Sequence, residues 1–112
     1  MANTPEGRVK EKIKKMLNTH DCYVTMPIGT GFGCAGVPDY LVCINGHFLG
    51  IEAKAGKNKP TDLQTLNLKR IDDAGGLALV INEENLNQLE FILEAPHPPI
   101  QLPAFCKTTH RS

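Results

Sequence analysis

The sequence lacks the features that mark several large classes of protein. It has no apolar run near the roughly 20 residues that span a bilayer, and residues 1–6 contain no apolar stretch typical of a signal peptide. Its four cysteines include no C-x-x-C pair, so we expect reduced thiols and no disulfide framework. Cys106 and His110, with His97 upstream, lack the paired spacing of a structural zinc site. We therefore expect a cytoplasmic protein with no membrane partner.

Signals for an organic cofactor or for stacked bases are also weak. Gly31-x-Gly33-x-x-Gly36 matches the dinucleotide fingerprint, but a strand follows it where the motif needs a helix. We therefore expect no organic cofactor, and interpret the glycines as a bend, a close approach to a partner or a plain flexible loop. Aromatic residues make up 5% of the chain, so the sequence does not indicate an aromatic platform on which bases would stack.

Charge is balanced in total and uneven along the chain. Twelve Lys and Arg residues balance twelve Asp and Glu residues among 112 residues. Residues 8–15 and 52–70 are mainly basic, whereas residues 71–95 carry acidic side chains and no basic one. A basic face suits a polyanion, although such faces are also common where a helix is simply solvated.

The pattern of apolar residues and turn signals predicts one small α/β domain over residues 1–95, followed by a Pro-rich tail over residues 96–112. The expected order is α-β-β-β-α-β-α, a small α/β sandwich around a central mixed sheet. The expected elements are a helix from Thr4 to Asn18, strands at Tyr23–Pro27, Tyr40–Ile44 and His47–Ala53, a helix from Thr61 to Ala74, a buried strand at Leu77–Ile81 and a helix at Glu83–Leu93.

Two carboxylates are expected to meet at one end of the central hairpin. Asn45-Gly46 predicts a tight turn, which sets Asp39 opposite Glu52, and alternation sets Lys54 on the same face as Glu52. Converging carboxylates repel each other unless a cation lies between them, and oxygen ligands suit Mg²⁺ or Mn²⁺. The alternative is an ordinary surface salt bridge among the three side chains.

Two further polar residues lie near the inward faces of the predicted helices. Taking Val9 as the origin, Glu6 falls at about 60°, within the apolar stripe, where it could reach a metal or its own helix N-terminus. In the second helix, Leu63, Leu66, Ile71 and Ala74 are expected to face inward, with Gln64 at the border of that face. Gln64 could bind a phosphate or serve only as the capping-box partner of the helix start.

Four motifs stand at close spacing and in a recognisable order: Gly36-Val-Pro-Asp39, Gly50-Ile-Glu-Ala-Lys54, Lys59-Pro-Thr-x-x-Gln64 and Ala74-Gly-Gly-x-Ala78. Together they resemble the PD-(D/E)XK nuclease superfamily, and are similar above all to the small stand-alone VRR-NUC domains of phages and bacteria. The resemblance extends from about residue 4 to residue 81. It implies a restriction-endonuclease-like sandwich fold and a metal-dependent phosphodiesterase in a bacterial or phage-infected cell.

The resemblance also implies roles for individual residues. Asp39, Glu52 and the backbone carbonyl of Ala53 would hold Mg²⁺ or Mn²⁺. Lys54 would position the attacking water or stabilise the transition state. Glu6 would take the place of the family's helical acid, with Glu11 as the alternative.

Gln64 would correspond to the family's helical glutamine. The family further implies homodimers that act on branched DNA such as Holliday junctions. Four lysines outside the core motifs would then flank the scissile phosphate, namely Lys10, Lys14, Lys57 and Lys59. The expected function is a metal-dependent DNA endonuclease. The alternative is a non-catalytic nucleic-acid-binding or assembly protein that retains the nuclease fold.

Overall fold

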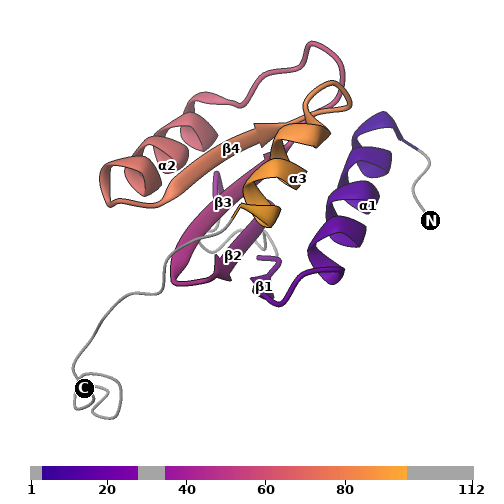
Figure 1. Ribbon diagram of the computed structural model, residues 1–112. Helices are drawn as coiled ribbons and strands as arrows, with labels where there is room; N and C mark the ends of the chain where they lie inside the picture. The colour runs from indigo at the N-terminus through magenta and orange to yellow at the C-terminus, as the bar shows by residue number, and fades with distance from the viewer. Residues whose placement is uncertain (1–3, 28–34, 96–112) are drawn as a thin grey trace.

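The computed structural model describes residues 4–27 and 35–95, which form one mixed α/β unit (Figure 1). The order along the chain is the predicted one: α1 (Pro5–Asn18), β1 (Tyr23–Thr25), β2 (Tyr40–Ile44), β3 (His47–Ala53), α2 (Asp62–Asp73), β4 (Leu77–Ile81) and α3 (Leu86–Glu94). The predictions for most of the glycine loop and for the Pro-rich tail lie outside the described residues. Among the described residues, no helix is both long and apolar enough to cross a membrane.

The four strands form a mixed sheet in the order β1-β2-β3-β4. The first three are antiparallel neighbours, and β4 pairs with β3 in parallel. Asn45 and Gly46 both have positive φ, 51° and 81°, as a two-residue type I′ turn requires. This turn pairs Tyr40 with Ile51 across the hairpin. The predicted register is confirmed, and the next position along sets Asp39 beside Glu52.

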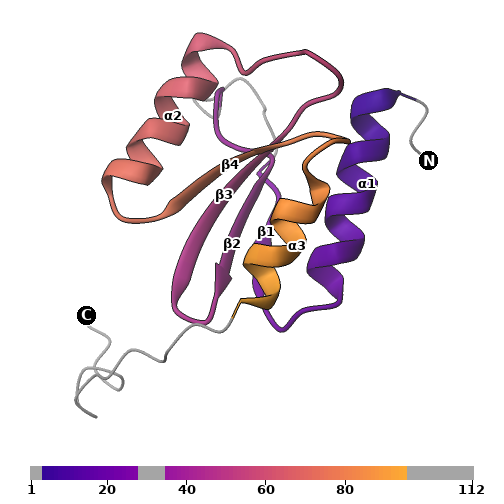
Figure 2. The ribbon, with the colours of Figure 1, turned by 45° about the horizontal axis from the view of Figure 1, so that its top comes forward.

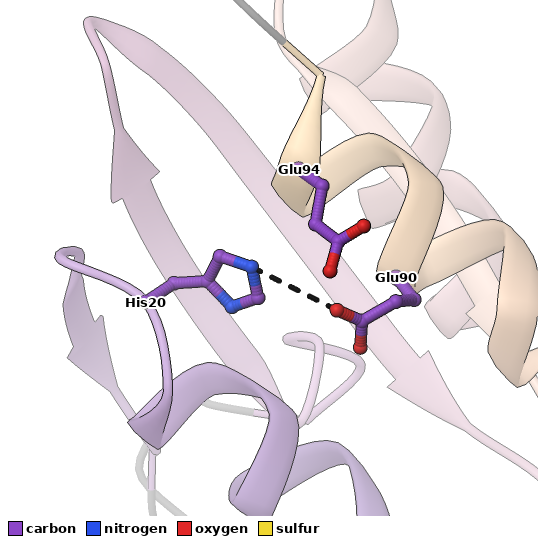
Figure 3. Close-up of side chains that lie close together, drawn as sticks. All are labelled: His20, Glu90 and Glu94. Atoms are coloured by element: carbon purple, nitrogen blue, oxygen red, sulfur yellow. Dashed lines mark ion pairs between the residues drawn. The ribbon is translucent and has the colours of Figure 1, made fainter.

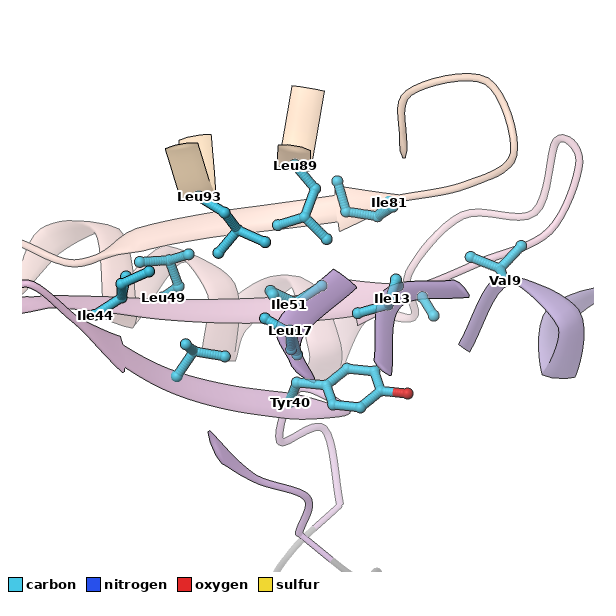
Figure 4. Packing of buried hydrophobic residues seen from close by; sticks show 12 residues of the cluster. Val9, Ile13, Leu17, Tyr40, Ile44, Leu49, Ile51, Ile81, Leu89 and Leu93 are labelled. Carbon is cyan, nitrogen blue, oxygen red and sulfur yellow. The ribbon is translucent and has the colours of Figure 1, made fainter. Parts of the chain in front are cut away.

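Helices cover both faces of the sheet (Figures 1 and 2). The main core lies beneath α1 and α3, where side chains from the helices meet alternate residues of the strands (Figure 4). Its members are Val9, Ile13, Leu17, Tyr40, Val42, Ile44, Leu49, Ile51, Ala53, Ile81, Leu89 and Leu93. On the other face, α2 packs closely because β3 has a glycine there. A Cβ on Gly50 would come within 2.5 Å of Ile71 Cδ1.

The inward side of α2 differs from the prediction. Leu63 and Leu66, expected to face the sheet, are 47% and 50% exposed, whereas Leu68 is 8% exposed. Ile71, also expected to face inward, does pack on the sheet. The buried side therefore lies toward the Ile71 edge of the predicted face and extends to Leu68. The reason is that α2 seats Ile71 over the gap left by Gly50, so backbone approach decides the orientation of the helix.

The burial of β4 and the start of α3 also differ from the prediction. Strand β4 was expected to be buried, yet it lies at the edge of the sheet and Leu77 is 44% exposed. The last helix begins at Leu86, three residues later than expected. Asn82 Oδ1 accepts hydrogen bonds from the backbone N–H groups of Glu84 and Asn85, at 2.8 and 3.2 Å, and this local turn competes with the helix.

Candidate active site

Asp39 and Ala53 join the ends of β2 and β3. Asp39 Oδ2 accepts a hydrogen bond from the backbone N–H of Ala53 at 2.9 Å. Because the N–H and C=O of one residue in a strand point to the same side, the Ala53 carbonyl also faces Asp39. The hairpin thus brings a carboxylate and a main-chain oxygen to one end of the sheet.

Glu52 is the buried carboxylate of this cluster. Glu52 is 2% exposed. Among the described residues, it is the one polar or charged residue that is buried. Its Oε1 has no hydrogen-bond partner among the described residues. Burial, and then the negative charge of Asp39, raise the pKa of Glu52 from 4.5 to about 7. A buried anionic oxygen without a partner is costly, so this position favours either a proton or a cation.

Lys54 lies beside Glu52, as the strand alternation predicts. Its Nζ is 3.7 Å from Glu52 Oε2, and its side chain is only 13% exposed. The ammonium therefore stays near the carboxylates and is mostly shielded from water. Such a group can orient a water molecule or stabilise developing negative charge.

Helix α1 contributes a second acid and a second lysine. Lys10 Nζ lies 3.5 Å from Glu6 Oε2 and 3.6 Å from Asp39 Oδ1. The charge of Glu6 also contributes to the raised pKa of Glu52. Glu6 therefore adjoins the cluster, whereas Glu11 lies on the exposed side of the helix. The ammonium of Lys10, which the family resemblance assigns to DNA binding, lies beside these two acids.

Gln64 has a defined structural role at the start of α2. Its Oε1 accepts a hydrogen bond from the backbone N–H of Thr61 at 2.8 Å, and its own N–H donates to Thr61 Oγ1 at 3.2 Å. The capping box that the sequence spacing indicated is therefore formed. This occupies the side-chain oxygen of Gln64, so a contact with phosphate would use the amide nitrogen.

Two surface hollows adjoin the acidic cluster. The larger, of about 620 Å³, lies between the start of α1 and the loop after β3, and both Glu6 and Lys57 line it. The smaller, of about 150 Å³, is lined by Lys10, Asp39, Tyr40 and two residues that follow β1. Lys14 and Lys59 are exposed.

Glu83 also lines the larger hollow, and the sequence patterns did not single it out. Its Oε1 accepts a hydrogen bond from the backbone N–H of Gly56 at 2.8 Å. Backbone hydrogen bonds, including that from Gly56, hold the pKa of Glu83 below its usual range. Glu83 thereby fixes the loop that carries Lys57.

A separate cluster of His20, Glu90 and Glu94, also missed by the sequence patterns, lies between the ends of α1 and α3 (Figure 3). One ligand atom from each lies within 4.8 Å of the others, and His20 Nε2 is 3.9 Å from Glu90 Oε2. His20 Nδ1 donates to the Met16 carbonyl at 2.9 Å, since a carbonyl can only accept. A hydrogen bond with Glu94 raises the pKa of Glu90. The available signal was the i, i+4 spacing of the two acids, but only packing brings His20 to them.

The cluster at the hairpin end and the His20 cluster differ in how well their ligand atoms suit a divalent metal ion. Asp39, Glu52 and the Ala53 carbonyl offer oxygen ligands, which suit Mg²⁺ or Mn²⁺. The buried, partnerless Oε1 of Glu52 is an acceptor that such an ion would satisfy. His20, just after α1, and Glu90 in α3 instead form an ion pair when the imidazole is protonated. The residues at the hairpin end therefore fit a divalent cation better.

Comparison with known proteins adds no assignment. No model of a known protein family matches the sequence, and no curated protein matches it significantly. A function must therefore rest on the chemistry of the cluster at the hairpin end.

Proposed function

We propose that this protein is a metal-dependent DNA endonuclease of the PD-(D/E)XK type. The observation that carries the proposal is the buried Oε1 of Glu52, which has no hydrogen-bond partner in the described residues and lies in a cluster with Asp39 and Lys54. A salt bridge at the surface would not need a carboxylate that is 2% exposed. The element order and the mixed sheet are consistent with a restriction-endonuclease-like sandwich.

Asp39, Glu52 and the Ala53 carbonyl would hold Mg²⁺ or Mn²⁺, with Glu6 as a further acid from α1. When bound, the ion supplies electrophilic stabilisation of the charge that develops on the phosphate. Lys54 would orient the attacking water through its ammonium. The water oxygen would form a bond to phosphorus and lose a proton to the solvent as one P–O ester bond breaks. The leaving oxygen would take up a proton, which gives one phosphate end and one hydroxyl end.

Backbone recognition would bring DNA to this site. The larger hollow is bordered by Lys57, and Lys59 and Lys14 expose further positive charge. Each neutralised phosphate releases counterions and strengthens binding at low salt. Branched DNA is the proposed substrate, and a homodimer would present two sites to its symmetric arms.

The first test compares cleavage of a labelled four-way junction, a flap and a plain duplex in EDTA, Mg²⁺ or Mn²⁺. We expect metal-dependent cleavage by the wild type and a loss of at least about a hundredfold in Lys54→Ala, the magnitude typical of a lost electrostatic stabiliser. DNA affinity should fall little, because Lys54 is largely buried and paired with Glu52.

Lys69→Ala is the matched control. Lys69 is an exposed lysine on α2 that pairs with Asp73, at 3.0 Å, away from the cluster. The Lys69→Ala variant should cleave each substrate as the wild type does. Salt-sensitive binding without cleavage of any substrate would contradict the nuclease and favour the non-catalytic binding protein.

A further inference from the structure

Lys10 places a positive charge inside the acidic cluster at the hairpin end. Its Nζ is 3.5 Å from Glu6 Oε2 and 3.6 Å from Asp39 Oδ1. The same charge lowers the pKa of Glu52 against the larger effects of burial and Asp39. One ammonium therefore acts on all three carboxylates.

The backbone of Lys10 is held in place by the fold. Tyr40 is buried, and its hydroxyl donates a hydrogen bond to the Lys10 carbonyl at 2.9 Å. Burial, with the charge of Asp39, raises the pKa of Tyr40 to about 12, so the hydroxyl remains a donor. This bond ties the second turn of α1 to β2. The side chain beyond it is 41% exposed, so its flexible stem can turn outward to water.

We propose that Lys10 is the resident counter-ion of the metal site. Its ammonium pairs with Asp39 and Glu6 in the metal-free protein and must move away when a divalent cation binds these acids. The inference rests on the proposed function, because it concerns the same metal ligands. Two cations a few ångströms apart repel each other, so Lys10 lowers the affinity for the metal.

The geometry also separates Lys10 from Lys54. Lys54 is 13% exposed and contacts Glu52, whereas Lys10 is 41% exposed and contacts the acids nearer the surface. Lys54 is therefore retained beside the buried acid, and Lys10 is the lysine that can leave. Lys10 also lines the smaller hollow, so its displaced ammonium has open space beside the cluster.

The test is a calorimetric titration of the full-length protein with MnCl₂ in the absence of DNA. Lys10→Met removes the charge and keeps the length of the side chain, and we expect it to bind Mn²⁺ about tenfold more tightly than the wild type. Lys10→Arg keeps the charge and should bind within about twofold of the wild type. Lys15→Met is the matched control, since Lys15 is exposed in the last turn of the same helix. It should also bind as the wild type does.

Asp39→Asn identifies the binding event, which should disappear in this variant and in Lys10→Met/Asp39→Asn. Circular dichroism then checks that every variant is folded. Equal Mn²⁺ affinity in Lys10→Met and the wild type would overturn the role of Lys10 and leave the proposed function in place. An equal gain in Lys15→Met would also overturn it, because net charge would explain the effect. Absence of Asp39-dependent Mn²⁺ binding in all variants would overturn both this inference and the proposed function.

Discussion

At the scale of single residues, Glu52 links stability to pH. Its pKa rises from 4.5 to about 7 in the folded protein, so the folded state binds its proton more tightly than the unfolded state. The stabilising contribution is fully present below pH 4.5 and is lost as pH rises through about 7. Above that range the fold holds a buried charge, whose cost a bound metal would offset.

Glu52→Gln removes this titration and tests it. In EDTA, the variant should equal the wild type in stability below pH 4.5 and exceed it at pH 8 by on the order of 3 kcal/mol, at about 1.4 kcal/mol per pKa unit. Urea unfolding across this pH range measures the difference. Glu84→Gln, which neutralises an exposed carboxylate, is the control. Parallel stability curves for wild type and Glu52→Gln would show that Glu52 does not retain a proton.

At the scale of the elements, a capping box stabilises the start of α2, the helix that follows the candidate active site along the chain. Thr61 and Gln64 exchange two hydrogen bonds there. Thr61→Ala removes the cap and should lower the free energy of unfolding by about 1 kcal/mol. Thr65→Ala, one turn further along at an exposed position, should change it by less than about 0.5 kcal/mol. Urea denaturation compares the two, and an equal loss in both would count against the capping role.

At the scale of the whole molecule, exposed lysines beside the larger hollow predict salt-dependent DNA binding. Lys57→Ala and Lys59→Ala should each weaken affinity for all sequences and reduce the slope of log affinity against log salt by about one. Fluorescence anisotropy with a labelled junction, from 50 to 200 mM salt (roughly the range in which such effects are large), measures this slope. Lys69→Ala should leave it unchanged. Slopes unaffected by either loop lysine would place the DNA on another face.

Much of the fold follows from short stretches of sequence. Thr4 and Pro5 begin the first helix as their local preferences require, and Asn45-Gly46 sets a turn whose positive φ angles few other pairs adopt. Because the turn fixes the register, the meeting of Asp39 with the end of β3 was also predictable. These features depend on neighbours within a few residues, or on a hairpin of known geometry.

The remaining features were decided by tertiary packing. The sequence could not indicate that α2 would turn Leu63 outward, since Gly50 and Ile71 meet only when the helix lies on the sheet. It also did not indicate that the Lys10 ammonium would pair with Asp39, which the fold sets within reach. Local sequence thus determined the order of the elements, the hairpin register and the pairing of Asp39 with Glu52. Only the tertiary structure decided which acid lost its contact with water and which lysine neutralised the others, because burial and charge pairing depend on segments distant in the chain.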